Sequence, residues 1–433
     1  MPIRPWLLLV ACTALICAAE PGFTISQTDA SGVYQAKDPI TWTVTAHDLP
    51  ALPPGSVSYL VQRNGLATVA SGALDLSSGS ATITATLDAP GTLLTTITAK
   101  LPSADKDKPK EVKAFAGAVV EPTKIATSAP KPADFDAFWA EQLAKAATIP
   151  LNPVLTVQPS DNANLDYWHI TLDNINGTHV RGQLARPKTG TKFPAMLIVQ
   201  WAGVYPLQKG WATGPAGAGW LTLNISAHDQ PIMEPEGFYK ELANGVLKNY
   251  TAIGNDDRTT SYFLRMFIGC SRAVDYLAQR PDWDGTTLIV TGASQGGLQS
   301  FVTAGLNPKV TAMLVEVPAG CDNTALLADR AIGWPYWVNS VKDEKRMETS
   351  RYFDAVNFAT RITCPSLIAL GLIDTTARPA GILAAANQLT GIKEVLIMPK
   401  AAHGGDHSPS PARSNAWKTA LKAGLPVPPP AKP

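Results

Sequence analysis

The chain has 433 residues, more than one ordinary domain needs, and this length favours two domains. Hydrophobic residues make up 45% of the chain and charged residues 16%, so a large core can form and extensive disorder is excluded. The formal net charge of +1 gives no electrostatic reason to expect a nucleic acid or an anionic membrane as a partner.

Residues 1–19 are expected to be a signal peptide. Arg4 precedes a mostly apolar run at residues 6–17, and Ala18 and Ala19 are small residues suited to cleavage. The run is too short to cross a bilayer, and no other apolar segment of the sequence is long enough. We therefore expect a secreted or periplasmic protein with no membrane partner.

Three cysteines follow this leader: Cys270, Cys321 and Cys364. In an oxidising compartment the simplest arrangement is one disulfide and one buried thiol, because three cysteines cannot all pair. The sequence contains no CxxC or Cys/His pattern typical of a metal site. We expect neither a metal nor another cofactor.

Residues 20–122 are expected to form a small all-β domain, an immunoglobulin-like sandwich. Short segments alternate apolar residues with Thr or Ser and are separated by Pro and Gly turns. The expected strands are residues 40–46, 56–62, 80–87 and 92–99. The charged run 106–110 is expected at a solvated hairpin tip. No candidate catalytic residue lies in this region, so we expect it to be removable without loss of kcat.

Residues 123–132 have the composition of a linker, and residues 426–433 form a Pro-rich tail. Between them, residues 133–425 alternate short apolar runs with helical segments, which predicts an α/β domain with a mostly parallel, doubly wound sheet covered on both faces. Asn176 and Gly177 are expected to turn a hairpin. The other expected strands are residues 194–200, 220–225, 286–291, 310–316, 366–371 and 394–398, and the expected helices are 134–143, 262–279, 380–389 and 413–423. Asp134 is expected to cap the first of these helices.

The segment Gly292-Ala-Ser-Gln-Gly-Gly follows an expected strand and precedes a helix-compatible stretch. A G-x-S-x-G pattern in that context predicts a nucleophile elbow. Only glycine fits two residues on either side of the nucleophile, at Gly292 and Gly296, because the turn is so sharp. Ser294 is therefore the candidate nucleophile, and the backbone N–H of Gln295 is a candidate oxyanion donor.

A serine nucleophile needs a base, and the base needs an acid, in the chain order Ser, Asp/Glu, His. Two of the six histidines follow the elbow, and His403 comes just after an expected strand, whereas His407 is interpreted as a surface residue. Asp374 ends another strand and is the candidate acid. Its rival, Glu316, is interpreted as a structural residue within a strand.

The second oxyanion donor is expected in the loop after residues 194–200, where Gly203 allows close backbone approach. Tyr205 in the same loop offers a phenol hydroxyl, with a packed aromatic as the alternative. His228 and Asp229 also sit at the sheet edge and are interpreted as loop hydrogen-bonding residues. Clustered aromatics at 334–337 predict either a sugar-stacking wall or a cap on the core.

Six segments occur in one order: residues 134–139, 150–154, 292–297, 352–359, 371–374 and 403–405. Together they resemble the acetyl xylan esterase and cephalosporin C deacetylase family, carbohydrate esterase family seven, over residues 130–425. The resemblance implies an α/β-hydrolase fold and deacetylation of small acetylated sugars. It also implies nucleophile, acid and base roles for Ser294, Asp374 and His403.

Three features depart from the family pattern. Val204 follows Gly203 where members usually have a tyrosine, so Val204 and Tyr205 both remain candidates for the second oxyanion donor. Residues 227–230 differ from the usual Arg-Gly-Gln-Gly. The N-terminal domain is an addition to the family's usual plan. The family's hexamers imply a homo-oligomer, and an added domain can block or change that assembly.

The sequence thus predicts a secreted serine carboxyl-ester hydrolase that removes acetyl groups from acetylated xylan or xylo-oligosaccharides through an acyl-enzyme. Two alternatives remain open. One is hydrolysis of another acyl bond on the same fold, such as a glucuronoyl or feruloyl ester or a peptide. The other is a glycan-binding protein with a vestigial hydrolase domain.

Overall fold

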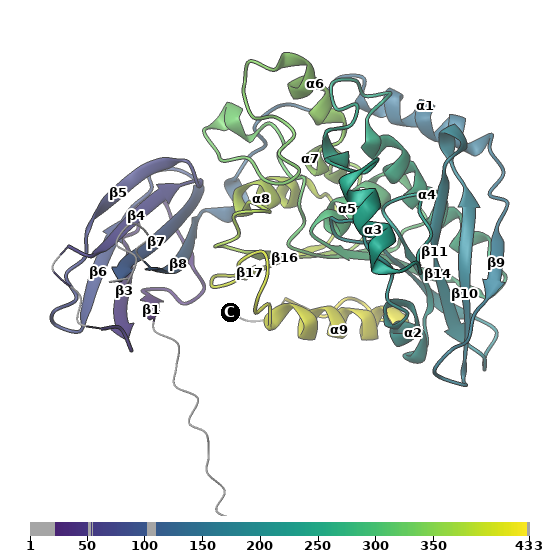
Figure 1. Ribbon diagram of the computed structural model, residues 1–433, viewed down its shortest axis with the longest axis horizontal. Helices are drawn as coiled ribbons and strands as arrows, with labels where there is room; N and C mark the ends of the chain where they lie inside the picture. The colour runs from purple at the N-terminus through teal and green to yellow at the C-terminus, as the bar shows by residue number, and fades with distance from the viewer. Residues whose placement is uncertain (1–21, 51–52, 54, 102–109, 431–433) are drawn as a thin grey trace, which may run out of the picture.

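The computed structural model describes residues 22–50, 53, 55–101 and 110–430 (Figure 1). The expected signal peptide, nearly all of the charged run at 106–110 and the end of the Pro-rich tail lie outside these ranges. Within them, no helix is long and apolar enough to cross a membrane.

The N-terminal residues form two sheets that share one hydrophobic core, with Trp42, Val61 and Ile97 fully buried in it. The smaller sheet contains β1 (Gly22–Gln27), β3 (Ile40–His47) and β6 (Ser80–Ala85). The larger has the order β2 (Val33–Tyr34), β8 (Lys110–Val120), β7 (Gly91–Leu101), β4 (Val57–Arg63) and β5 (Ala67–Ala73). All four strands expected from the alternating pattern are present. The immunoglobulin-like class stays a prediction.

The rest of the chain is a mixed α/β structure built on one nine-stranded sheet. Its order is β17 (Lys393–Met398), β16 (Ser366–Gly371), β15 (Ala312–Glu316), β14 (Trp283–Ala293), β12 (Phe193–Ile198), β13 (Leu221–Ile225), β11 (His179–Pro187), β10 (Leu165–Asp173) and β9 (Val154–Val157). Strands from β17 to β13 pair in parallel, and β11, β10 and β9 complete the sheet antiparallel. The expected hairpin is β10–β11, with Asn176 at φ 56° in its turn.

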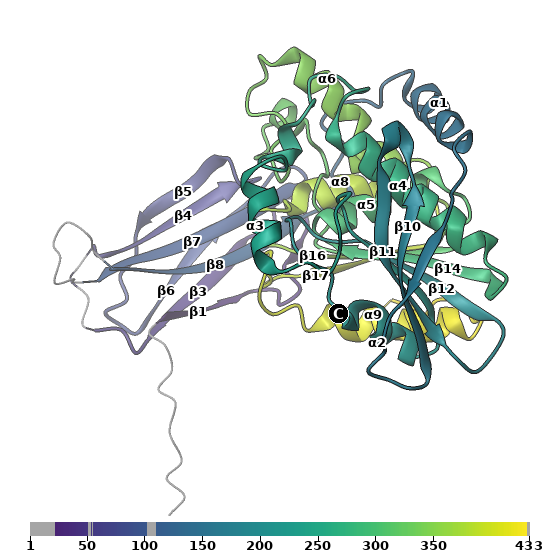
Figure 2. The same cartoon turned by 45° about the vertical axis from the view of Figure 1, so that its right-hand side comes forward.

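Helices cover both faces of this sheet, as Figures 1 and 2 show. They are α1 (Phe135–Ala147), α2 (Gly210–Gly217), α3 (Glu236–Asn244), α4 (Tyr262–Gln279), α5 (Gln295–Leu306), α6 (Glu344–Tyr352), α7 (Ala355–Ala359), α8 (Pro379–Gln388) and α9 (Pro409–Lys422). Side chains alternate along a strand, so Leu288 and Val290 join the large core on the α4–α5 face. Ile289 between them packs in the smaller core with Trp417 of α9.

The N-terminal sheets pack directly against the α/β region. Val119 of β8 is fully buried in the main α/β core, and Gly117 lies against Leu372. The segment predicted as a linker is fixed in place, since the Ser128 N–H and hydroxyl both bind Asp322, at 2.8 and 2.5 Å. The two regions are therefore physically joined beyond their covalent connection.

Two local expectations were wrong. Cys270, Cys321 and Cys364 are all free, because they lie on α4 and on two loops that do not bring any pair together. Asp134 precedes α1 but does not cap it. Its carboxylate instead binds Arg258 at 2.7 Å and the hydroxyl of Tyr352.

Candidate active site

Ser294 occupies a strained turn between β14 and α5, with φ 56° and ψ −121°. A Cβ added at Gly292 would lie 2.7 Å from the carbonyl carbon of Gly296, and one added at Gly296 would lie 2.6 Å from the Val199 oxygen. Side chains do not fit at these distances, so both glycines are needed, as the G-x-S-x-G pattern predicted. The Ser294 N–H donates to the Glu316 carbonyl at 3.0 Å, which ties the turn to β15.

Three side chains from three loops at the carboxyl edge of the sheet form a hydrogen-bonded chain. Ser294 Oγ lies 2.9 Å from His403 Nε2, and His403 Nδ1 lies 2.8 Å from Asp374 Oδ2. The loops follow β14, β17 and β16, so parallel pairing of these strands brings residues 109 positions apart into contact. The structure therefore brings together the serine, acid and histidine chosen from the sequence.

The Asp374 carboxylate is fully buried, whereas the His403 ring is 28% exposed. The second carboxylate oxygen of Asp374, Oδ1, accepts hydrogen bonds from the backbone N–H groups of Thr376 and Ala377 at 2.7 and 2.8 Å. A buried carboxylate held by two N–H donors has little freedom to rotate, so it can orient the imidazole and keep Nε2 facing the serine.

Glu316 and His407, the other acid and the other histidine considered from the sequence, bind each other. His407 Nδ1 lies 3.0 Å from Glu316 Oε1, and His407 Nε2 lies 2.9 Å from the Ala402 oxygen. Burial disfavours the charged ring, but the bonds to Glu316 and Ala402 outweigh burial and raise the pKa of His407. His407 is thus a bonded residue with 11% side-chain exposure, and its interpretation as a surface residue was wrong.

The loop after β12 approaches the elbow, with Gly203 at φ 128°. The Tyr205 hydroxyl donates to the Trp201 oxygen at 2.9 Å, so it is occupied within its own loop. In the described part of the chain, the backbone N–H groups of Val204 and Tyr205 have no hydrogen-bond acceptor. Both remain available as the second oxyanion donor beside the Gln295 N–H, which begins α5.

His228 is hydrogen-bonded to the loop after β12, which agrees with the loop hydrogen bonding expected of it. Its Nε2 donates to the Gly203 oxygen at 3.0 Å, and its Nδ1 accepts from Tyr262 Oη at 2.7 Å. Burial, assisted by nearby cationic charge, lowers the pKa of His228 to about 4 and keeps the ring neutral, as this pair of bonds requires. Asp229 binds Arg181 at 2.7 Å and has a structural role.

Tyr250 is a residue that sequence reasoning missed. Its hydroxyl donates to Gln295 Oε1 at 2.6 Å, and its ring meets His228 edge to face with centroids 4.7 Å apart. It thereby links the start of α5 to His228, which in turn binds the loop after β12. It lies in a short 3₁₀ segment, and no periodicity or motif distinguished it in the sequence.

The aromatics at 334–337 mostly cap the core. Trp337 is 3% exposed and stacks between Phe263 and Phe353. The exposed ring of Trp201 lies beside the elbow instead, and it contacts the half-buried rings of Tyr205 and Trp211. Within the described ranges, no group of three or more His, Cys, Asp or Glu side chains could hold a metal ion.

A mixed α/β sheet with a Ser–His–Asp chain above a strand-to-helix turn has the arrangement that serine hydrolases share. A family model described as acetyl xylan esterase (AXE1) matches residues 121–421, and the chain belongs to this family. The acetyl esterase Axe7A of Xylanibacter ruminicola is 36% identical over 282 residues. That alignment covers 62% of this chain and 62% of the relative, so the chain matches less than two thirds of that protein's length.

Two solved structures share the fold. An acetyl xylan esterase from Paenibacillus sp. R4 is 23% identical, with a TM-score of 0.60 over 70% of this chain and 98% of that one. Acetyl xylan esterase 1 from Thermoanaerobacterium sp. is 19% identical, with a TM-score of 0.59 over 68% and 96%. Both likenesses leave about a third of this chain without a counterpart.

Proposed function

We propose that this protein is an exported serine carboxyl-ester hydrolase that removes acetyl groups from acetylated xylan or xylo-oligosaccharides. The observation that carries the proposal is the hydrogen-bonded chain Ser294–His403–Asp374, in a member of the acetyl xylan esterase family. Export rests on the sequence of residues 1–19. We further propose that residues 20–122 form a β-sandwich domain attached to a catalytic domain at 133–425, and that the enzyme acts as a homo-oligomer.

In this mechanism His403 Nε2 takes the proton of Ser294 as Oγ attacks the acetyl carbonyl carbon. The carbonyl oxygen becomes an oxyanion that accepts from the Gln295 N–H and from a second N–H, of Val204 or Tyr205. His403 then gives its proton to the departing sugar oxygen. The products of this half-reaction are a free sugar hydroxyl and an acetyl ester on Ser294.

Water completes the cycle by the same route. His403 removes a proton from the water, which attacks the acetyl carbonyl and expels Ser294 Oγ, and the serine recovers its proton from the imidazolium. Asp374 stabilises the imidazolium formed in each half through its bond to Nδ1, and the two N–H groups on its other oxygen hold the carboxylate in place. Acetate is released.

The proposal is tested by following acetate release from acetylated xylo-oligosaccharides, together with hydrolysis of p-nitrophenyl acetate and butyrate. We expect kcat/KM to be higher on acetate, because a tight acyl pocket rejects extra methylenes. Equal values on acetate and butyrate would favour another acyl bond as the natural substrate. An enzyme with intact fold and no turnover on any ester would instead identify a vestigial site.

A further inference from the structure

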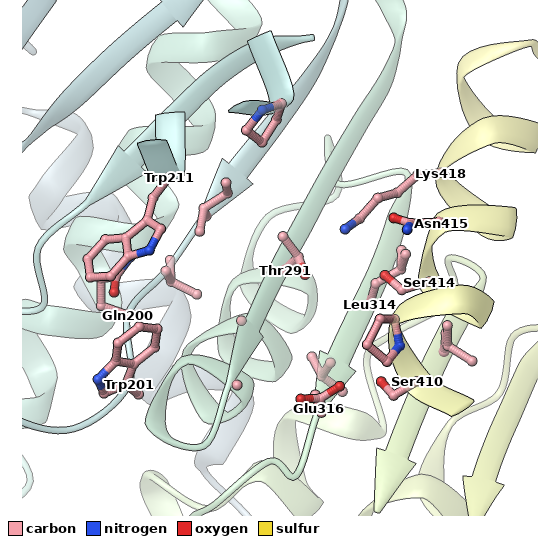
Figure 3. A pocket seen from close by; sticks show the side chains of 18 of the residues that line it. Gln200, Trp201, Trp211, Thr291, Leu314, Glu316, Ser410, Ser414, Asn415 and Lys418 are labelled. Carbon is pink, nitrogen blue, oxygen red and sulfur yellow. The ribbon is translucent and has the colours of Figure 1, made fainter. Parts of the chain in front are cut away.

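A cavity lies on the face of the sheet opposite α4 and α5. Its floor is formed by side chains of β12, β14, β15 and β16, and its sides by α2 and α9 (Figure 3). Its volume of about 440 Å³ lies within the range typical of small-molecule sites. Gly292, Ala293 and Trp201 are among its lining residues, but Ser294 is not.

Lys418 extends from α9 into this cavity, toward Thr291 (Figure 3). In the described part of the chain its ammonium group has no hydrogen bond and no ion pair. Burial lowers the pKa of Lys418, and the negative charge of Glu316 only partly opposes this effect. A cation withdrawn from water without a paired anion is unfavourable, and a bound anionic group would relieve that cost.

The rest of the lining suits a hydroxylated ring. Glu316 uses one carboxylate oxygen for His407, and its other oxygen has no partner among the described residues. The side chains of Ser414 and Asn415 on α9 likewise make no hydrogen bond there and face the same space. Opposite them, the indole of Trp211 supplies an apolar wall (Figure 3).

We propose that this cavity binds a sugar acid of the uronic acid class. The carboxylate of the sugar pairs with Lys418, its hydroxyls bind the free Glu316 oxygen and Asn415, and the apolar face of its ring lies on Trp211. Each group of the ligand thus meets a lining group that has no partner, or an open apolar wall. The proposal does not depend on the hydrolytic function, because Ser294 is not part of the cavity.

The test is calorimetric titration with D-glucuronate, with D-glucose and acetate as comparison ligands. We expect saturable binding of glucuronate in the millimolar range and much weaker binding of either comparison ligand, since each lacks half of the recognised groups. The Ser294→Ala variant should bind glucuronate as the wild type does. Binding of glucose or acetate equal to that of glucuronate, or loss of binding in Ser294→Ala, would overturn the proposal.

Two lysines on one helix provide a matched pair of variants. Lys418→Met should weaken glucuronate binding about tenfold or more, because a hydrogen bond to a charged group is lost. Lys422→Met is the control, since Lys422 lies one turn further along α9 and donates to the Ala218 oxygen outside the cavity. Thermal unfolding establishes that each variant is folded, and Lys418→Gln serves if the methionine variant is not. Unchanged affinity in the folded Lys418 variant would refute the assignment.

Discussion

Gly117 of β8 lies against Leu372, in the loop that carries Asp374. A Cβ at this position would lie 2.5 Å from Leu372 Cβ and 2.7 Å from the Leu372 backbone carbon and oxygen. Ordinary contact begins at 3.4 Å, so Gly117→Ala must displace Leu372 or β8 by close to an ångström. Leu372 is buried and two residues from Asp374, and its N–H binds the Met398 oxygen of β17 at 3.1 Å.

The expected cost has two parts. Forcing one extra carbon into a packed interface typically costs about 1–3 kcal/mol of stability. A misplacement of about 1 Å in a catalytic group can lower the rate on the order of 100-fold. The Asp374–His403 bond of 2.8 Å has little room for such a shift. We therefore predict that Gly117→Ala lowers both the Tm and the kcat on p-nitrophenyl acetate while the protein stays folded.

Gly72→Ala is the matched control. Gly72 lies in β5 of the same sheet, and a Cβ there would meet only the ring of Tyr59, at 3.1 Å, which can move aside. The Gly72→Ala variant should therefore retain the wild-type kcat. If Gly117→Ala also retained wild-type kcat and Tm, the argument that β8 holds the Asp374 loop would be wrong. The expectation that residues 20–122 can be removed without loss of kcat would then be favoured.

Three further predictions concern single side chains. Ser294→Ala should stay folded by circular dichroism and lose nearly all turnover, with a residual acceleration over water of at most about 10³–10⁴-fold; wild-type kcat would exclude the acyl-enzyme. Tyr205→Phe should cost roughly 0.5–1.5 kcal/mol of stability and leave kcat nearly unchanged, since the hydroxyl is bound to Trp201; a large fall in kcat would instead make the hydroxyl an oxyanion donor. The raised pKa of His407 means that its bonds stabilise the fold fully below the unfolded value of about 6.5, and that this contribution is lost as pH rises through the folded pKa. His407→Gln should therefore lower the Tm more at about pH 5 than at about pH 9, and an equal decrease at both would contradict the raised pKa.

The sequence predicted best where one local pattern decides the structure. Helix 262–279 was predicted to the residue, because Ser261 caps it through the Phe263 N–H and its apolar residues follow helical spacing. The elbow and its two glycines also follow from local sterics. Parallel strands present their loops at one edge, so the approach of Ser294, His403 and Asp374 could be expected as well.

What could not be predicted depends on surfaces that meet only in three dimensions. Asp134 looked like a helix cap, but Arg258, more than a hundred residues away, binds its carboxylate. The contact of Gly117 with Leu372 requires both regions to be folded and docked. The cavity beside Lys418 is lined by residues of both α2 and α9, and no pattern in either helix predicts the distance between them.

The segment between the two regions, residues 122–130, is held by hydrogen bonds to side chains of the α/β region. Besides the bonds of Ser128, the Asn387 side chain holds the carbonyl oxygens of Pro122 and Ile125, both at 2.9 Å, and Arg351 holds that of Pro130 at 2.7 Å. A flexible tether would let an attached module search the space around the catalytic centre. Here these bonds hold the N-terminal sheets in one orientation relative to Ser294. A long polymer that contacts both surfaces must therefore follow the path that this orientation sets between them.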